Sequence, residues 1–560
     1  MISLFSGKNY KAFDNFELEI KPITVLLGAN SCGKSALINA LLMLSQSIDT
    51  MDISESALRL NGKKVGMGEA LNLIKNKSQK NQLSFSFNLT ETNKQARELT
   101  GFQYDFIETQ IWLIRSAYFG IRQINDVNFK FRKEFINSLE SAFYQSEKFD
   151  IAEITKKALF SIKEIKSCKN KLEDKEIPSR NKESANYIFN LSQKKLKDSF
   201  LKLTTVDGDK IAASTIEYNF DYNEKKENIS ISGFKLLNNE NNVILNLSIS
   251  KSLKIDILSD VFDEKTLNNS KGELKKHLDF DSLSLIKEER LNKNFEFARR
   301  EVNNPVVLYL LKLIYVSVQN LVKELKDLKI NHVSPLRAFP QRYYLLDKSI
   351  HHNQLNSLDG TELAEVLKKN PNIKKEINRL LSRFRIAIDI ERVNDIIHKI
   401  TVNQDTVSLE LTDVGFGISQ VLPILVQAML SPKDSITIIE QPEIHLHPNM
   451  QAWLTDALID IALKQQKFFI IETHSDTLIR RIRLRIVDKE WSLTENDIAI
   501  YHLEKDKSKS RTNLNRVLIN SVGELDWPID FMDVEIQDTI EYQRKKSEKI
   551  LSQMKGENNA

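Results

Sequence analysis

The sequence predicts an α/β fold in which a mixed sheet with a phosphate-loop core is split by a large, mainly helical insertion. Three uninterrupted apolar runs, at residues 23–28, 435–440 and 467–473, are typical of parallel strands covered by helices on both faces. Between the first run and the other two, residues 101–330 are rich in Lys, Asn and Glu and contain helical stretches. Within them, the alternating segments STIEYNFDY and NISISGF predict a short antiparallel hairpin.

Length and composition bound the domain organisation. The chain has 560 residues, of which 41% are apolar and 28% charged, and this length allows about three to five domains. We expect an N-terminal lobe (1–100), the insertion (101–330), a C-terminal lobe (331–535) and a polar tail (536–560). The formal charge of +4 is too small to indicate a nucleic-acid-binding protein by itself.

Cysteine usage and hydropathy bear on the compartment. Cys32 and Cys168 cannot build a disulfide framework or a zinc ribbon, which indicates a reducing environment. No apolar run reaches the roughly 18–20 residues that a membrane span needs. The first residues lack the basic start and long apolar stretch of a signal peptide. We therefore expect a cytoplasmic protein without a membrane partner.

The strongest motif is GANSCGKS at residues 28–35, which satisfies the pattern GxxxxGK[ST] between an apolar strand and a helical run. Lys34 is expected to reach the β- and γ-phosphates of ATP, and Ser35 to bind Mg²⁺. The strand and the helix on either side argue against a chance match in a Gly-containing turn. The remaining residues expected to surround the nucleotide phosphates through their backbone are Gly28, Asn30, Ser31, Cys32 and Gly33.

A second group of candidate residues lies at 411–475. Glu440 ends an apolar strand, which places its carboxylate at the carboxyl edge of the sheet, where it would hold Mg²⁺ through water. If each residue is considered by itself, the simpler interpretation is that Glu440 is a surface carboxylate and that His474 is a hydrogen-bonded polar group without a catalytic role. Their order behind the phosphate loop favours the functional interpretation. A turn that opens a helix precedes both of them, and it contains Gly415, Gly417, Ser419 and Gln420.

These strings resemble the ABC-type ATPase family, in the branch that contains RecF, SMC, Rad50 and the OLD-like ATPases. The chain reads GANSCGKS, VGFGISQVLP, IEQPEIHLHP and ETHSD where OLD-like ATPases have GxNssGKS, VGfGxSQvLP, IEqPExHLHP and ETHSd. They correspond to Walker A, the signature loop, Walker B with the D-loop, and the switch histidine. His332–Arg337 is similar to the gPlR strand of that branch, and residues 522–533 to the closing element of a bacterial subfamily. The resemblance covers residues 1–100 and 331–535 and implies an ABC-type ATPase head.

In that family two ATP molecules are sandwiched between two heads, and the signature loop of each head reaches the nucleotide of the other. The resemblance therefore implies a homodimer or a higher even oligomer. It implies that Gly417 and Ser419 contact the γ-phosphate in trans. It also implies that His445 and His447 lie in the D-loop and that His474 senses the γ-phosphate.

Gln441 stands where ABC-type ATPases have the glutamate that polarises the attacking water. An amide cannot accept a proton, and general-base help typically contributes about 10²–10⁴-fold. Either Glu443 substitutes as the base, or turnover is slow and ATP acts mainly as an assembly ligand. We favour slow hydrolysis. The expected catalytic group is Glu440, Gln441, Glu443 and His474.

No nuclease centre is expected within this chain. OLD enzymes carry a Toprim nuclease after the ATPase, but only 87 residues follow Thr473, and two distant cysteines provide no HNH metal cluster. OLD-like ATPases without their own nuclease include the PtuA ATPases of Septu and retron antiphage defence. That resemblance implies a separate HNH-type nuclease as partner and, in retrons, a reverse transcriptase with its msDNA. The alternatives are a RecF- or SMC-like ATPase that acts directly on DNA, and a transporter ATPase, which the signature string disfavours.

Other features leave two interpretations open. Tyr10 and Phe13 either pack on the adenine or belong to the core of an edge strand. Residues 151–200 hold 12 Lys and Arg against seven Asp and Glu, and four arginines follow the switch histidine. Both basic groups are either DNA- or RNA-binding surfaces or solvated faces. Helical spacing spreads the four arginines, so they cannot all face one ligand. They are Arg480, Arg481, Arg483 and Arg485.

Overall fold

The computed structural model describes residues 1–49, 56–90, 92–124, 133–144, 150–171, 177–250, 254–286, 302, 304–326, 328–337, 340–345, 362–506, 508, 511–526 and 538–549. The chain forms two compact units, one of residues 1–18 and 41–326 and the other of residues 19–40 and 327–560. Much of the expected closing element (527–533) and of the expected tail (536–537 and 550–560) lies outside the described residues.

A six-stranded sheet, in the order β17-β16-β3-β15-β14-β9, is the centre of the second unit. Neighbouring strands from β16 to β9 run parallel, whereas β17 pairs antiparallel at one edge. The three apolar runs form β3, β14 and β15 side by side, and nearly all of their residues are buried. The strands are β3 (Ile23–Gly28), β9 (Ile330–Val333), β14 (Ile436–Glu440), β15 (Phe468–Glu472), β16 (Ile498–Asp506) and β17 (Arg511–Val517).

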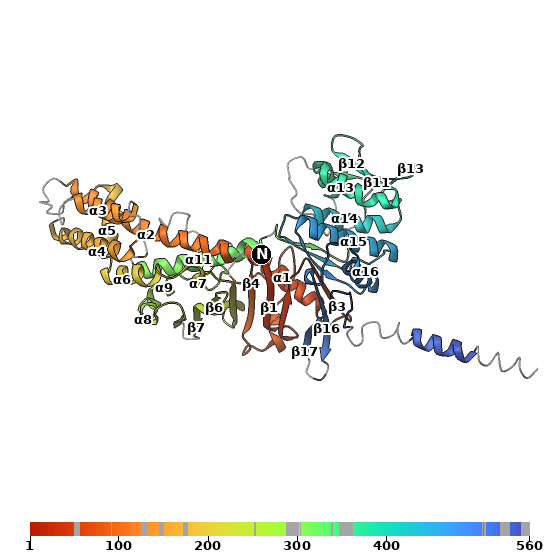
Figure 1. Ribbon diagram of the computed structural model, residues 1–560, viewed down its shortest axis with the longest axis horizontal. Coiled ribbons are helices and arrows are strands. Elements are labelled where there is room, and N and C mark those ends of the chain that lie inside the picture. Colours follow the sequence, from red (N-terminus) through yellow and green to blue (C-terminus); the bar gives the residue numbers. More distant parts are fainter. Residues whose placement is uncertain are drawn as a thin grey trace, which may run out of the picture. The chain divides into compact units, whose positions relative to one another are not determined.

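Helices and a small second sheet complete this unit (Figure 1). One hydrophobic core joins Val25 and Ile439 of the sheet to Leu425 of α14 and Leu458 of α15. The helices are α12 (Leu363–Lys369), α13 (Pro371–Leu381), α14 (Phe416–Leu430), α15 (Pro448–Gln465), α16 (Asp476–Val487) and residues 34–40 of α1 (Lys34–Asp49), whose remainder belongs to the first unit. The small sheet consists of β10 (Tyr344–Leu345), β11 (Ile386–Arg392), β12 (Ile397–Gln404) and β13 (Val407–Glu410).

The first unit contains a seven-stranded sheet in the order β2-β1-β4-β5-β6-β7-β8. The expected hairpin is present as the antiparallel pair β5 and β6, and β5 also pairs with β4, so strands from the insertion extend the sheet of the N-terminal segment. The strands are β1 (Ile2–Tyr10), β2 (Phe13–Glu19), β4 (Leu83–Leu89), β5 (Thr215–Asn223), β6 (Asn228–Leu237), β7 (Val243–Ile249) and β8 (Ile255–Leu258).

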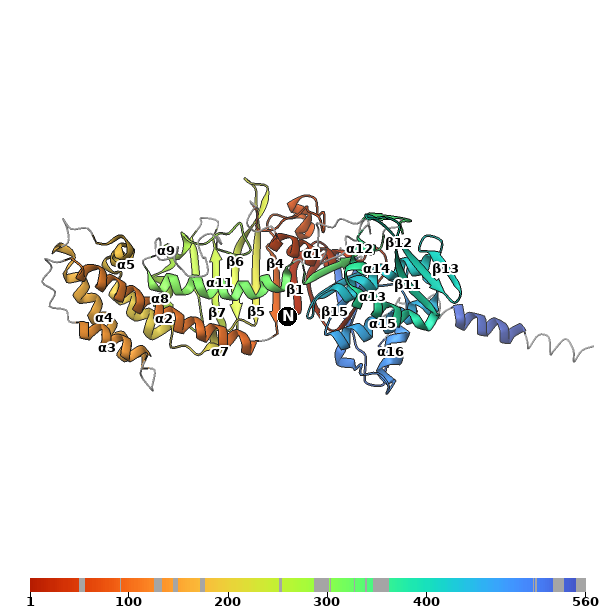
Figure 2. The same ribbon diagram turned by 90° about the horizontal axis from the view of Figure 1, so that it is seen from above.

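Nine helices among the described residues belong to this unit. Figure 2 shows the long helix α11 crossing one face of the seven-stranded sheet. Helix α2 contacts α11, and it also packs against α3, α4 and α5. They are α2 (Thr92–Arg122), α3 (Lys133–Tyr144), α4 (Ile151–Ser167), α5 (Ser179–Asn190), α6 (Gln193–Asp198), α7 (Gly208–Ile211), α8 (Glu264–Asn268), α9 (Lys271–Lys275) and α11 (Pro305–Leu325).

Helix α11 corrects one expectation. By length and composition its 21 residues are apolar enough to cross a membrane, so the statement that no run reaches a membrane span was wrong. In the structure, 72% of its most apolar window is buried inside the protein. The core helix of a folded domain passes the same test, because a helix that is apolar on most sides is buried by its neighbours.

Tyr10 and Phe13 belong to an aromatic cluster in the first unit. Both side chains are fully buried, and their rings contact Phe16 at centroid distances of 6.3 and 5.5 Å. Phe85 packs against Tyr10 from the neighbouring strand β4 at 5.4 Å. The core interpretation of these two residues is therefore confirmed, because a fully buried ring has no face left for an adenine.

Candidate functional site

The phosphate-loop motif lies between β3 and α1, as predicted. Gly28 has a φ of +138°, and a Cβ atom there would lie 2.5 Å from the carbonyl oxygen of Leu503. Lys34 is 4% exposed, and its Nζ donates to the carbonyls of Gly28 at 2.8 Å and Ala29 at 3.0 Å. The loop thus curls around the ammonium group at the start of a helix, which is the geometry that binds phosphate. Of the other predicted loop residues, Cys32 is buried, Gly33 is half-buried, and the exposed ones are Asn30, Ser31 and Ser35.

Glu472, which the sequence motifs did not indicate, contacts this loop. Strand β15 runs between β3 and β14, so the acid at its end reaches the loop directly. Glu472 Oε1 is 3.8 Å from Lys34 Nζ, and Ser35 Oγ donates to Glu472 Oε2 at 3.4 Å. The signal that indicated Glu440, a buried strand ending in an acid, is equally present in the string FFIIE.

Glu440 and Glu472 end adjacent parallel strands and are paired in register. Burial and the neighbouring Glu440 carboxylate raise the pKa of Glu472 to about 7, although Lys34 and Ser35 act in the opposite direction. Glu440 is 9% exposed, and its Oε1 lies 2.7 Å from Nε2 of His332 on β9. Two buried carboxylates side by side repel each other when both are ionised, so both can be ionised only if a nearby cation compensates their charge.

The donor set fits Mg²⁺. Ser35, Glu440 and Glu472 offer hydroxyl and carboxylate oxygens, the hard ligands that Mg²⁺ prefers. Among the described residues there is no group of three or more His, Cys, Asp or Glu side chains that could form a protein-only metal site. Mg²⁺ is commonly held by one or two carboxylates together with nucleotide phosphates and water, which is the arrangement these residues allow.

Replacing Glu472 with glutamine tests its part in binding the metal. With ATP present, we expect the affinity for Mn²⁺, used in place of Mg²⁺, to fall about 10- to 100-fold in an electron paramagnetic resonance titration. Without metal the variant should melt no lower than the wild type, because the substitution removes repulsion with Glu440. Glu504→Gln, an exposed carboxylate on β16, is the control. An unchanged Mn²⁺ affinity would exclude a metal role for Glu472.

The turn after Glu440 has an unusual backbone. Gln441 has a φ of +45°, and its N–H donates to the Glu472 carbonyl at 2.7 Å. Nη2 of Arg337 donates to the carbonyls of Glu440 and Gln441, both at 3.0 Å. Arg337 is 5% exposed, and burial lowers the pKa of its guanidinium to about 10. The negative charge of Glu443 acts in the opposite direction and raises this pKa. This buried cation holds the backbone of Glu440 and Gln441 in place.

The Glu443 carboxylate is occupied on both oxygens. Oε2 accepts from the Thr473 hydroxyl at 2.8 Å, and Oε1 accepts from the His474 backbone N–H at 2.7 Å. The His474 side chain is exposed. Partial burial and the positive charge of Lys34 lower the pKa of its imidazole, with Glu443 acting in the opposite direction. The structure thus brings His474 into the electrostatic reach of the phosphate loop, as a neutral ring at pH 7.

The signature turn opens α14, as predicted. Gly415 is the N-cap of this helix, and a Cβ atom at Gly417 would lie 3.6 Å from Leu446 Cδ2. Ser419 and Gln420 lie one turn further along and are both 3% exposed. The start of the helix, rather than these two side chains, is therefore available to an approaching ligand.

The predicted D-loop lies between β14 and α15. His445 has a φ of +62°. His447 is the N-cap of α15, and its Nδ1 accepts from the Asn449 N–H at 3.3 Å. The side chain of His447 thus satisfies a free N–H group at the start of α15.

A family model identifies the class of this protein. Residues 1–479, well over half of the chain, match the AAA ATPase domain. The chain belongs to this ATPase family. Together with the phosphate-loop core described above, this confirms the predicted α/β ATPase head with a large helical insertion.

Several solved SMC heads resemble this ATPase. The SMC head domain from Thermotoga maritima covers 92% of this chain and 99% of its own, at 7% identity and a TM-score of 0.32. An SMC head bound to the C-winged helix domain of ScpA covers 92% and 97%, at 8% identity and a TM-score of 0.34. Scores this low carry no information on function. No curated protein matches the chain.

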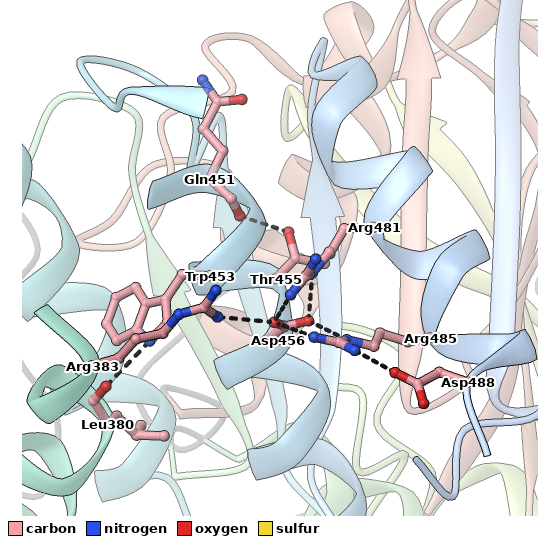
Figure 3. A network of polar contacts seen from close by, with 9 residues as sticks. All are labelled: Leu380, Arg383, Gln451, Trp453, Thr455, Asp456, Arg481, Arg485 and Asp488. Carbon is pink, nitrogen blue, oxygen red and sulfur yellow. Dashed lines mark hydrogen bonds and ion pairs between the residues drawn. The ribbon is translucent and has the colours of Figure 1, made fainter. Parts of the chain in front are cut away.

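In this ATPase the four arginines after the switch histidine all have partners within the chain. Arg481 and Arg485 both bind Asp456 of α15, with nitrogen–oxygen distances between 2.5 and 2.8 Å (Figure 3). Arg483 Nε donates to the Gly523 carbonyl at 2.7 Å, and Arg480 forms an ion pair with Asp476. These contacts favour a structural role, in which α16 is fastened to α15.

Asp456→Ala should strongly destabilise this ATPase. Asp456 is 7% exposed; burial tends to raise the pKa of its carboxyl, but Arg485 and Arg481 hold the pKa below its usual range. Removing it leaves two partly buried guanidinium groups without their shared acceptor, which costs about 3–5 kcal/mol. Asp460→Ala, one turn along the same helix, removes only surface pairs and should cost less than about 1 kcal/mol. Equal shifts in melting temperature for the two variants would contradict this role.

Proposed function

We propose that this chain binds ATP and Mg²⁺ at the edge formed by Lys34, Ser35, Glu440 and Glu472, and that it hydrolyses ATP slowly. The observation that carries this proposal is the meeting of these four side chains at one end of the parallel sheet, although they come from three separate segments. Lys34 would bind the β- and γ-phosphates. The three oxygen ligands would hold Mg²⁺, which neutralises charge on the phosphates.

Slow turnover follows from the residue that occupies the base position. The Gln441 amide can orient a water molecule but cannot take its proton. Glu443, the other candidate base, already accepts two hydrogen bonds. The experiment is calorimetric titration with ATP and Mg²⁺, followed by a phosphate-release assay. Tight binding with a slow but measurable rate supports the proposal, and an absence of ATP binding overturns it.

We further propose that two copies assemble around ATP, as a homodimer or a higher even oligomer. The start of α14, from Gly415 to Gly417, would contact the nucleotide of the other copy through its backbone N–H groups. Ser419 was expected to make this contact, but its side chain is buried within its own subunit, so the backbone carries the proposal. Light scattering with and without ATP tests it, because the proposal requires that ATP raise the mass to at least twice that of the monomer.

The finer role we propose is that of a cytoplasmic subunit of a bacterial antiphage defence complex that regulates a separate HNH-type nuclease. Support comes from the four OLD-like strings and from the resemblance to the PtuA ATPases of Septu and retron systems. A retron would add a reverse transcriptase and its msDNA to the complex. The test is purification together with the products of neighbouring genes, with and without ATP, and mass determination of every component.

The same preparation tests the alternative, a RecF- or SMC-like ATPase that acts directly on DNA. Recovery of a stoichiometric nuclease supports the defence role. Recovery of a bare oligomer whose ATP turnover rises when DNA is added supports DNA maintenance instead. The two roles share the nucleotide site described above, so both outcomes are compatible with ATP binding.

A further inference from the structure

One side chain of the D-loop and one side chain of the following helix α15 bind the switch-histidine segment. Glu443 is the first, because its carboxylate accepts from the Thr473 hydroxyl at 2.8 Å and from the His474 N–H at 2.7 Å. Hydrogen bonds to a charged acceptor are roughly twice as strong as neutral ones. The backbone of His474 is therefore fastened to the turn that follows Gln441.

Gln451 is the second link. Ser475 Oγ donates to Gln451 Oε1 at 2.7 Å, and Gln451 Nε2 donates to the Leu446 carbonyl at 2.9 Å. Leu446 is 7% exposed and belongs to the same hydrophobic core as Ile418 in the first turn of α14. Hydrogen bonds thus link the segment of His474 to Leu446, which shares its core with the first turn of α14.

We propose that Glu443 is a positioning residue that transmits the state of the nucleotide site, sensed at His474, through Leu446 to the first turn of α14. The inference rests on the proposed ATPase function, since it names how that site controls the surface facing a second subunit. A shift of the His474 backbone must move Glu443 or break two charge-assisted hydrogen bonds. Because Leu446 of the turn and Ile418 of α14 share one close-packed core, a movement of the turn displaces the residues around Gly417.

This role differs from that of a catalytic base. A base directs a lone pair at the attacking water, whereas the hydrogen bonds that Glu443 makes, one on each oxygen, come from donors of the switch segment. Substitutions can distinguish the effect of the Glu443 charge from the effect of its hydrogen bonds. A glutamine there can still accept from the His474 N–H and can donate to the Thr473 hydroxyl, which is able to accept. An alanine loses both contacts.

The test compares Glu443→Ala with Glu443→Gln in the full chain. We expect both variants to bind a fluorescent ATP analogue within about threefold of the wild type, because Glu443 has no contact with the phosphate loop. Turnover should fall about tenfold in Glu443→Ala, the scale of coupling through positioning residues, and clearly less in Glu443→Gln. Amide hydrogen exchange is the decisive readout: in Glu443→Ala, ATP should still protect residues 28–37 but no longer residues 413–420.

The outcomes separate this inference from the function on which it rests. If the wild type binds no ATP, the proposed function fails. If the wild type binds ATP and Glu443→Ala still shows full ATP-dependent protection of residues 413–420, the inference is overturned. Loss of protection and of turnover in Glu443→Gln equal to that in Glu443→Ala would also overturn it, because it would show that the charge, as in a base, is what matters. Gln451→Ala, which breaks only the second link, should give a partial loss of that protection even if Glu443→Ala folds poorly.

Discussion

Replacing Lys34 with alanine is expected to abolish ATP binding. Its ammonium group is almost fully buried, faces two loop carbonyls and lies 3.8 Å from the Glu472 carboxylate. Without it, the phosphates of ATP would meet the Glu440 and Glu472 carboxylates with less compensating positive charge. Truncating one partner of a buried charge pair typically costs 2–5 kcal/mol or more, so we expect the affinity to fall at least about 30-fold.

Calorimetric titration measures this loss, and Lys21→Ala is the matched control. Lys21 lies two residues before β3, but its partner is Glu19, and the side chains of both are partly exposed to solvent, at 31% and 40%. We expect Lys21→Ala to bind ATP within about twofold of the wild type, because surface ion pairs contribute little. Binding by Lys34→Ala within about tenfold of the wild type would show that the nucleotide site lies elsewhere.

The parts of the site that are contiguous in sequence could be predicted from it. The phosphate loop, with its lysine and its serine hydroxyl, occupies eight consecutive residues. Local geometry alone therefore places Lys34 and Ser35 just after the end of β3. Glu440 was predicted as the acid beside this loop, yet Glu472 is the acid that touches it. Both strands end in glutamate, and only the strand order decides which one is the neighbour of β3. That order depends on packing between segments more than 400 residues apart, which no motif encodes.

Roles that depend on a distant partner were not predictable for the same reason. The spacing of the four arginines on α16 showed that they could not all face one ligand, but Asp456, the acceptor shared by Arg481 and Arg485, lies on another helix. Glu443 read as a substitute base because it follows Gln441 by two residues. Its true partners, Thr473 and the His474 N–H, become visible only when β14 and β15 are side by side.

The insertion shows the corresponding limit for the fold. Alternating residues predicted the pairing of β5 with β6, because a hairpin is local. The pairing of β4 with β5 joins Leu83 to Phe220 across more than a hundred intervening residues. A strand that buries one of its faces can pair with any of several other strands. The alternation alone therefore could not indicate that this hairpin continues the N-terminal sheet.

Gln441→Glu is expected to raise the rate of ATP hydrolysis by about 100-fold, the lower end of what general-base catalysis contributes. The substitution is nearly isosteric, and the backbone at this position is held by the Glu472 carbonyl and by Arg337. The new carboxylate should therefore take the position of the amide and accept the proton of the attacking water. ATP affinity should stay within about threefold, because the phosphate loop is unchanged.

The pH dependence of this gain has a definite sign. The neighbouring carboxylates Glu440 and Glu472 disfavour a third negative charge, so the pKa of the introduced carboxyl should be raised and its basic form should increase with pH. Steady-state phosphate release should then show a larger ratio of variant to wild type at pH 8 than at pH 6.5. Gln441→Ala, which has neither amide nor carboxylate, should hydrolyse no faster than the wild type. An unchanged rate in Gln441→Glu, with ATP still bound, would mean that the missing base does not limit turnover and that a step outside the chemistry does.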